Sequence, residues 1–398
     1  MNDDNSQLNV LMGMDAYLPD VDGVIQCMHN YCVNLNNKCN LTAMVPKHKR
    51  ADDSKYPYKI VRCRSMYVPF VRDYYCLPHL DGKFRKGIHG NEYDIIHVHS
   101  PFNMAKFALK TAKKKNIPCV ATFHTNFRPI FQKVFKIKWI AELVVKHLGR
   151  RYNKFDKIFV CSDKVAEQAR SFGYKGDIVY LPYGTELQRA TREEIEEYKT
   201  KANEVFNLDK DELVLLYVGR VMKLKRIEFT LDALKVVKDK GIKFKFYIVG
   251  KGADLESTKK YAEKLGFTDK EVIFTGFLER EKLPLINSRA NLLLFPSLYD
   301  NFGLVKVEAA GYDTAGVFVK DSCAACEIVD GENGYLCENN VDSYAETIMR
   351  AVADRTHLDV VGKNAGETLY INWAQCTDKL LETYHQVIEE YKQKNSNN

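Results

Sequence analysis

Two clusters of charged residues in the second half of the chain have the types and spacing to bind a diphosphate and a sugar. In the first cluster, Arg220 follows the apolar run 213–218, and Lys225 lies five residues further on, where a helical pattern begins. A guanidinium offers a planar fork of donors, an ammonium offers a point charge, and a helix N-terminus adds free N–H groups. Such a pair of cations also occurs on solvated surfaces, so the pattern alone leaves both interpretations open.

The second cluster follows an apolar run that ends at Phe295. Asp300 lies in the next loop, Gly303 permits a close backbone approach to a ligand, and a helical segment then carries Glu308. Carboxylates accept hydrogen bonds from sugar hydroxyls, and the first amides of a helix bind anions. The segment is therefore a candidate sugar and phosphate site, although two carboxylates eight residues apart carry little weight alone.

A third candidate is the basic, aromatic-rich segment 128–157. It includes Lys133, Lys136, Lys138 and Trp139, and only Glu142 and Asp156 oppose its positive charges. A basic amphipathic segment suits the surface of an anionic membrane. The alternative is a solvated helix whose apolar stripe packs on the sheet. Nucleic acid is not expected, because no recognised binding module accompanies the charge.

Other short patterns predict less. Asp20 and Asp22 form a D-x-D pair with nothing around it to complete a metal site. His97 and His99 share one face of a predicted strand, where they are expected to line a cleft, and no third metal ligand presents itself. The segment 250–252, Gly-Lys-Gly, is an incomplete dinucleotide fingerprint. We therefore expect neither a metal nor a bound dinucleotide.

The elements that position these residues alternate between strand and helix. Apolar, β-branched runs typical of buried parallel strands occur in both halves of the chain, with helical patterns between them. This indicates an α/β fold of two doubly wound, Rossmann-like domains facing across a cleft. We predict a first domain over 1–185, a second over 186–375, and a C-terminal helix over 376–398 that packs back on the first domain. The expected strands are 8–12, 41–45, 58–63, 95–98, 119–123, 158–161 and 178–181, followed by 213–218, 244–249, 272–274, 292–295 and 317–319.

Composition restricts the class of protein. The 398 residues are 45% hydrophobic and 28% charged, which excludes a disordered chain or a collagen. The eleven cysteines are irregularly spaced, so we expect reduced thiols. The formal net charge of +7 permits an anionic partner without selecting one. No signal peptide or membrane span is recognisable, and we expect a cytoplasmic protein, either free or peripheral on the inner face of the membrane.

Nine short motifs together resemble the retaining GT-B glycosyltransferases of family 4, and they appear in the order of that family. The first-domain motifs are most similar to the diacylglycerol glucosyltransferase branch, which is monotopic and uses UDP-glucose. The motif segments are 17–24, 94–102, 120–125, 181–186, 218–225, 248–252, 272–277, 300–308 and 327–334.

The resemblance implies a role for each matching residue, as well as a nucleotide-sugar co-substrate and no metal or tightly bound cofactor. Arg220 and Lys225 would stabilise the departing diphosphate, and Glu308 would hold the ribose. Asp300 and His124 would contact the donor sugar. The remaining donor contacts implied are Gly23 at the diphosphate, Gly250 and Phe277 near the base, and the amides of Gly303, Leu304 and Val305 at phosphate or sugar.

One departure concerns Asp300, because the family usually has glutamate there. Aspartate is one methylene shorter and leaves the identity of the donor sugar open. We expect transfer of a hexose from a nucleotide sugar such as UDP-glucose to a membrane lipid such as diacylglycerol. The alternatives are a soluble or polyprenyl-linked glycan acceptor in capsule or exopolysaccharide synthesis, or an inactive glycosyltransferase-like partner protein.

Overall fold

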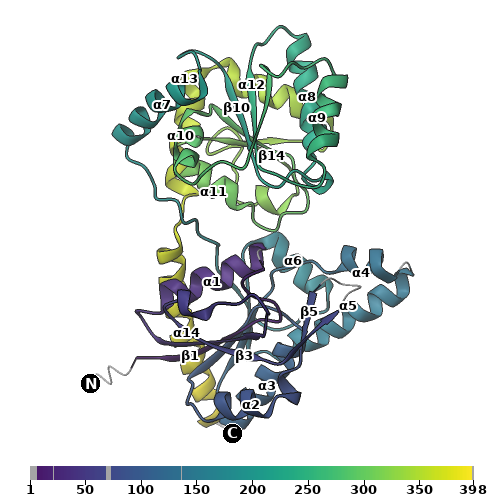
Figure 1. Cartoon of the computed structure of the whole chain (residues 1–398), viewed down its shortest axis with the longest axis vertical. Coiled ribbons are helices and arrows are strands. Elements are labelled where there is room, and N and C mark those ends of the chain that lie inside the picture. The colour runs from purple at the N-terminus through teal and green to yellow at the C-terminus, as the bar shows by residue number, and fades with distance from the viewer. Residues whose placement is uncertain (1–6, 21, 69–72, 136, 397–398) are drawn as a thin grey trace. The chain divides into compact units, whose positions relative to one another are not determined.

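The computed structural model describes the chain except for residues 1–6, 21, 69–72, 136, 397 and 398 (Figure 1). It divides into two compact units. Unit 1 comprises Met1–Tyr183 and Trp373–Asn398, and unit 2 comprises Gly184–Asn372. Each unit is built on one parallel sheet with helices packed on it, which confirms the predicted α/β class with two Rossmann-like domains.

The sheet of unit 1 has seven parallel strands in the order β3-β2-β1-β6-β7-β8-β9. The reversal of strand order beside β1 is the switch point at which doubly wound sheets leave a crevice. Val10, Leu11 and Met12 of the central strand are completely buried, as a sheet covered on both faces requires. The strands are β1 (Asn9–Gly13), β2 (Asn40–Pro46), β3 (Lys59–Cys63), β6 (Ile95–Val98), β7 (Cys119–Thr122), β8 (Lys157–Val160) and β9 (Ile178–Tyr180).

Helices cover both faces of this sheet. The first, α1, begins directly after Asp22, whose carboxylate accepts hydrogen bonds from the amides of Val24 (2.8 Å) and Ile25 (2.7 Å). One half of the D-x-D pair is therefore a helix N-cap. The helices of unit 1 are α1 (Gly23–Leu35), α2 (Gly82–His89), α3 (Asn103–Lys115), α4 (Arg128–Phe135), α5 (Lys138–Tyr152), α6 (Asp163–Ser171) and α14 (Trp373–Ser396).

A small antiparallel hairpin, β4 (Ser65–Val68) with β5 (Asp73–Cys76), was not expected from the sequence. It begins two residues after β3 ends, and Arg64 and Ser65 interrupt the apolar pattern there. At the other end of the chain, α14 begins at Trp373 and packs against α1. Its buried side chains include Leu380, Tyr384 and Val387, which lie on one face of the helix.

The sheet of unit 2 has six parallel strands in the order β12-β11-β10-β13-β14-β15. The last of them, β15, was missed because only three residues pair. The strands are β10 (Val214–Val218), β11 (Lys245–Val249), β12 (Val272–Gly276), β13 (Leu292–Phe295), β14 (Gly316–Val319) and β15 (Tyr335–Cys337). The helices are α7 (Arg192–Phe206), α8 (Ile227–Asp239), α9 (Leu255–Lys264), α10 (Lys282–Arg289), α11 (Leu304–Ala310), α12 (Val341–Ala353) and α13 (Arg355–Thr368).

None of the helices in the described part of the chain combines the length and the hydropathy that a membrane crossing demands. The eleven cysteines all lie in the described part of the chain and none of them is in a disulfide, as their irregular spacing predicts.

Candidate functional site

An ion pair joins the two charged clusters at the carboxyl edge of the sheet in unit 2. Lys225 ends a short 3-10 turn, η3 (Lys223–Lys225), after β10, and its ammonium pairs with Oδ1 of Asp300 in the loop after β13. Because β10 and β13 are parallel neighbours, their carboxyl ends meet at one edge. The two side chains are only 18% and 23% exposed, and Oδ2 of Asp300 is buried with no hydrogen-bond partner among the described residues. A buried acceptor without a donor is costly, so this oxygen is a point where a ligand hydroxyl fits.

The residues predicted at the base and the diphosphate follow neighbouring strands along the same edge. In spatial order, Phe277 follows β12, Gly250 follows β11, Arg220 follows β10 and Asp300 follows β13. The Phe277 ring is 76% exposed and the Arg220 side chain is also exposed. A Cβ at Gly250 would lie 1.9 Å from the carbonyl oxygen of Gly219, so only glycine lets these two strand ends approach.

Sequence reasoning missed Arg226, the residue after the 3-10 turn. Its guanidinium lies over the ring of Phe229, at 4.0 Å from the centroid, and donates to the carbonyl oxygen of Pro296 (3.2 Å). It thereby ties the Lys225 turn to the loop that carries Asp300. In the sequence, the structural role of Arg226 is signalled only by the basic run 223–226. That run does not show which of its cations would bind a ligand and which would hold the loop in place.

Glu308 lies on α11, which begins after Gly303 in a left-handed conformation (φ 74°). Leu304 and Val305, whose amides were predicted to bind donor, form the first turn of this helix. Burial raises the pKa of the half-buried Glu308 to about 7, and the nearby Glu186 raises it further in the same direction. A carboxylate whose pKa is near 7 is readily protonated, and a hydrogen bond from a donor such as a sugar hydroxyl stabilises its charged form.

In unit 1, His124 lies in a buried chain of hydrogen-bonded side chains. Its Nε2 contacts Nδ1 of His99 (2.8 Å) and its Nδ1 contacts the hydroxyl of Tyr183 (2.7 Å). Beside this chain, His97 contacts the hydroxyls of Tyr384 and Thr122, each at 2.7 Å. The expectation that His97 and His99 line a cleft is wrong, because they are 0% and 2% exposed. Strands β6 and β7 are central in the sheet, so these side chains lie beneath the covering helices.

Burial lowers the pKa of all three histidines. The pKa of His124 falls to about 3, and those of His97 and His99 fall well below 6.5, with the other histidines adding to the shift. All three rings are therefore neutral at physiological pH. Ligand atoms of Cys27, His99 and His124 lie within 4.8 Å of one another, so a third metal-ligating residue does lie beside the histidines. The His124 nitrogens are, however, engaged with His99 and Tyr183, and this group fits a hydrogen-bonded core.

Comparisons with known proteins agree with this geometry. The family described as glycosyl transferases group 1 matches residues 199–368, and glycosyltransferase family 4 matches residues 21–189. The chain belongs to the family 4 glycosyltransferases. It is a hexosyltransferase with the GT-B fold, as the motifs predict.

Three relatives illustrate the similarity. An alpha-monoglucosyldiacylglycerol synthase of Acholeplasma laidlawii is 23% identical over 376 residues, covering 88% of this chain and 90% of that protein. The structure of sucrose-phosphate synthase from Thermosynechococcus elongatus superposes with a TM-score of 0.76 at 20% identity, covering 96% of this chain and all of that chain. HepE of Anabaena in complex with UDP superposes with a TM-score of 0.74 at 15% identity, covering 95% of this chain and 100% of that chain.

The glycosyltransferase also exposes apolar side chains on α4 and α5, within the basic segment of unit 1. Trp139 is 66% exposed, although Ala141, Val145 and Leu148 of the same helix are buried on the unit. We call the exposed set the apolar ridge; it consists of Ile130 (49%), Val134 (65%), Phe135 (39%), Ile137 (48%), Trp139 and Leu143 (56%). One stripe of the segment therefore packs on the unit, and a second stripe faces outward.

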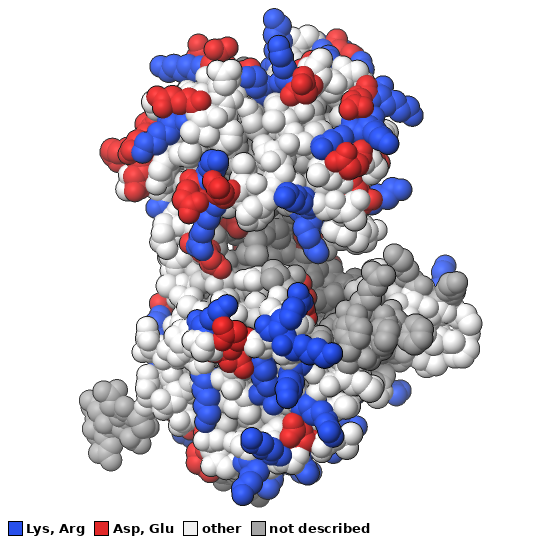
Figure 2. All heavy atoms as spheres, in the orientation of Figure 1, with Lys and Arg blue, Asp and Glu red and all other residues white. Residues whose placement is uncertain are grey.

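The charges of the same segment divide in a similar way. Arg128 pairs with Glu142 (3.0 Å), and Arg151 donates to the carbonyl oxygen of Pro101 (2.6 Å), so these two arginines brace the fold. Lys138 is exposed beside Trp139. Lys136 lies outside the described residues, as does the side chain of Lys133. On the face shown in Figure 2, unit 1 carries fewer acidic side chains among its lysines and arginines than unit 2 does.

Proposed function

We propose that this glycosyltransferase transfers glucose from UDP-glucose to diacylglycerol at a membrane surface, with retention of configuration at the anomeric carbon. The observation that carries the proposal is the Lys225–Asp300 pair at the carboxyl edge of the unit 2 sheet, with one buried carboxylate oxygen left for a ligand. Parallel α/β sheets bind ligands at this edge.

In the proposed reaction, Arg220 and Lys225 bind the diphosphate of the donor. The bond between the anomeric carbon and the diphosphate breaks, and the acceptor oxygen bonds to the same face of the sugar. The proton of the acceptor hydroxyl leaves with the diphosphate. The two cations stabilise the negative charge that develops on the departing group, which is the kind of electrostatic term that contributes most in many enzymes. No metal is needed in this scheme, because the side-chain cations supply the positive charge.

The remaining residues position the donor. Asp300 accepts a hydrogen bond from a sugar hydroxyl through Oδ2, while Oδ1 stays on Lys225. Glu308 holds the ribose hydroxyls, and the amides of Gly303, Leu304 and Val305 bind phosphate or sugar. Phe277 and Gly250 flank the base.

In unit 1, the family motifs assign donor contacts to Gly23, at the diphosphate, and to His124, at the sugar. Gly23 has no atom within 4 Å of where its Cβ would stand, so its backbone is open to a ligand. His124 is a neutral ring fixed by two neighbours, and contact with the sugar would replace one of those hydrogen bonds.

The proposed acceptor rests on the apolar ridge and on the printed name of the Acholeplasma relative, a glucosyldiacylglycerol synthase. Exposed apolar side chains beside a lysine, here Lys138, are typical of surfaces that enter the headgroup layer. Trp139 supplies an aromatic ring of the kind enriched at membrane interfaces, and each lysine near an anionic surface contributes about 1 kcal/mol.

The test combines a donor panel with vesicles. Purified protein is given UDP-, GDP- and ADP-sugars, with anionic vesicles that either contain or lack diacylglycerol, and nucleotide release and glycolipid are measured. We expect UDP release from UDP-glucose that rises with diacylglycerol. Release that ignores lipid would move the acceptor to a soluble or polyprenyl-linked glycan. No turnover of any donor would favour the inactive partner protein.

A second arm tests the membrane surface. Trp139→Ala combined with Lys138→Ala should weaken vesicle binding about fivefold to tenfold, since one lysine and one exposed aromatic side chain are lost. Lys201→Ala, an exposed lysine on α7 of unit 2, is the matched control and should leave binding unchanged. Unchanged vesicle binding in the double variant would contradict the proposed surface.

A further inference from the structure

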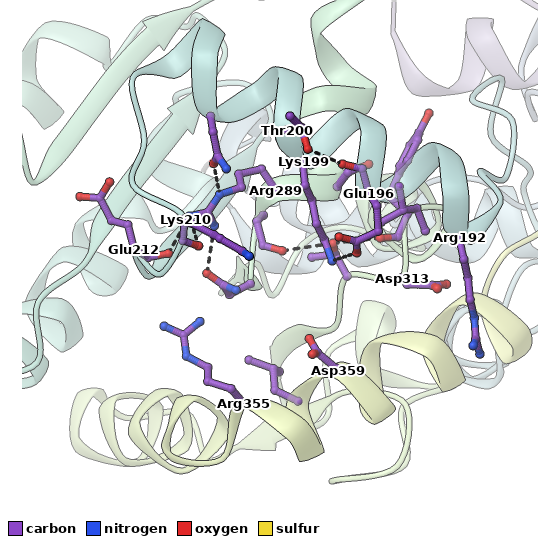
Figure 3. Close-up of a pocket in the computed structure, with 18 of the residues that line it drawn as sticks. Arg192, Glu196, Lys199, Thr200, Lys210, Glu212, Arg289, Asp313, Arg355 and Asp359 are labelled. Carbon is purple, nitrogen blue, oxygen red and sulfur yellow. Dashed lines mark hydrogen bonds and ion pairs between the residues drawn. The ribbon is translucent and has the colours of Figure 1, made fainter.

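Unit 2 contains a pocket of about 800 Å³ that is separate from the proposed donor site (Figure 3). It lies between α7, the segment before β10, the end of α10 and the start of α13. Glu212, Asn291 and Thr314 line it, and they precede β10, β13 and β14, whereas Arg220 and Asp300 follow β10 and β13. The pocket is therefore at the amino edge of the sheet, roughly 16 Å away if a five-residue strand rises about 3.3 Å per residue.

The buried guanidinium of Arg289 forms part of the pocket wall. This residue is only 5% exposed, and it donates to Oδ1 of Asn203 (2.6 Å) and to the carbonyl oxygens of Asp209 (2.8 Å) and Glu212 (2.9 Å). All of these acceptors are neutral groups. The donors of Arg289 are satisfied, yet its positive charge is not cancelled by a hydrogen-bonded carboxylate.

Two further cations, Lys210 and Arg355, extend into the same pocket (Figure 3). Within the described part of the chain, neither side chain forms an ion pair. Burial lowers the pKa of both arginines; the charge of Glu212 raises the pKa of Arg289 in part, and that of Arg355 lowers it. Of the acidic groups, Glu196 is paired with Lys199 (2.8 Å) and Glu212 with Lys245 (2.9 Å).

The remaining acids only partly compensate these cations. Asp211 and Asp359 raise the pKa of Arg355 through space without contacting it, and Asp313 lies 3.5 Å from Arg189. Among the described residues that line the pocket, Arg289 has its donors satisfied by neutral acceptors, whereas Lys210 and Arg355 have no ion-pair partner.

A buried hydroxyl gives the second, independent observation. Ser288, which precedes Arg289 and lines the pocket, is 2% exposed, and its Oγ has no hydrogen-bond partner in the described structure. Leaving a buried hydroxyl unbonded costs about 1–3 kcal/mol. A ligand oxygen in the pocket would remove this cost.

We propose that this pocket is a second ligand site and that it binds a small phosphate-bearing molecule, distinct from the sugar donor. A phosphate accepts from the hydroxyl of Ser288, from the guanidinium fork of Arg355 and from the ammonium of Lys210. A neutral ligand would offer no charge partner to Lys210 and Arg355, which form no ion pair among the described residues. The volume is within the range of small-molecule sites and exceeds the needs of a bare phosphate, so the rest of the ligand lies along Thr200 and Asn203 of α7.

The test measures phosphate binding to the full chain with the proposed donor site disabled. An Arg220→Ala/Lys225→Ala variant is titrated with inorganic phosphate and with glucose 6-phosphate at constant ionic strength, and binding is followed by calorimetry and by ³¹P line broadening. We expect saturable binding at one site. Tighter binding of glucose 6-phosphate would assign the pocket to a phosphorylated sugar, and equal binding would assign it to the phosphate group itself.

Pocket variants then locate the bound phosphate. Adding Arg355→Ala should weaken binding tenfold or more, and Ser288→Ala should weaken it severalfold. Arg355→Gln serves as a second variant that keeps the polar side chain, and Lys259→Ala on α9 is the control that should change nothing. The proposal is overturned if the donor-site variant shows no saturable binding, or if its binding is unaffected by the changes at both Arg355 and Ser288. Neither result depends on glycosyl transfer, so failure here leaves the proposed reaction standing.

Discussion

The proposed donor site in unit 2 and the histidine chain in unit 1 are opposite in character. In unit 2, Lys225 and Asp300 carry full charges at the edge of a sheet, and one carboxylate oxygen still lacks a donor. In unit 1, His124 is a neutral ring whose two nitrogens both contact partners within the core. The charged side chains at the edge of the unit 2 sheet are suited to binding a departing diphosphate. The neutral His124 ring, fixed by two hydrogen bonds, is suited to holding the side chains around it in place.

This contrast separates two kinds of contribution to glycosyl transfer. Loss of a charge that acts in the transition state lowers the rate with little effect on folding. Loss of a buried ring that forms two hydrogen bonds destabilises the folded protein, and this effect comes before any effect on the reaction. The following predictions test whether the two units divide in this way.

The largest effect is expected for Lys225→Ala. Removing the ammonium takes away charge stabilisation of the leaving diphosphate and leaves the Asp300 carboxylate unpaired. We expect kcat to fall about 10²–10³-fold, comparable to the loss of one preorganised donor in other enzymes. Steady-state UDP release measures it, and Lys223→Ala, an exposed neighbour in the same turn, should retain activity. Full activity of Lys225→Ala would mean that the diphosphate binds elsewhere.

The next effect concerns stability rather than rate. His124→Ala removes one hydrogen-bond partner from the hydroxyl of Tyr183 and one from Nδ1 of His99 in a buried site. The free energy of unfolding should fall by about 2–4 kcal/mol. Denaturant unfolding measures this, with the exposed His357→Ala in unit 2 as control. A variant as stable as the parent would show that the chain does not brace unit 1.

Acid should weaken unit 1 through the same histidines. In the folded protein the pKa values of these histidines lie below 6.5. Between pH 6.5 and about 3, the unfolded chain therefore binds more protons than the folded chain does. Stability is therefore fully present above pH 6.5 and is lost as pH falls, by about 1.4 kcal/mol per pH unit for each histidine. Unfolding curves at several pH values measure the slope. A slope unaffected by His124→Ala would contradict the assignment.

The smallest effect is expected for Glu308→Gln. The pKa of Glu308 is raised from 4.5 to about 7, so the unfolded chain loses this proton first and stability falls as pH rises through that window. Glutamine removes the penalty, and the donor-free protein should gain about 1–2 kcal/mol above pH 7, after allowance for partial exposure. The KM for the donor should rise at the same time, because the proposed ribose contact is weakened. Greater stability with an unchanged KM would remove Glu308 from the donor site.

Much of the fold was predictable because buried parallel strands are continuous apolar runs. The strand at Ile95–Val98 was predicted with the bounds that the structure has, and others differ by a residue or two at their ends. The hairpin of β4 and β5 and the three-residue β15 were missed. Their sequences lack the apolar run that identifies a central strand, and their pairing depends on the sheet beside them.

The features of the candidate sites likewise divide into those that the sequence predicted and those that it did not. The motifs placed Arg220, Asp300 and Gly250 at strand ends correctly, because sequence order fixes which residue follows a strand. They did not predict the Lys225–Asp300 ion pair, which depends on β10 and β13 being neighbours in space. The burial of His97 and His99 and the pocket beside Arg289 depend on helices far away in the sequence, and no local pattern signals them.

The most direct test of the account is glycolipid formation from UDP-glucose and diacylglycerol in anionic vesicles by the parent protein and by Lys225→Ala, with product configuration read by NMR. We predict an α-linked glucosyl diacylglycerol from the parent and almost none from the variant, which should remain folded at the assay temperature. Equal product from both proteins, or no sugar transfer by the parent from any nucleotide sugar, would contradict the account.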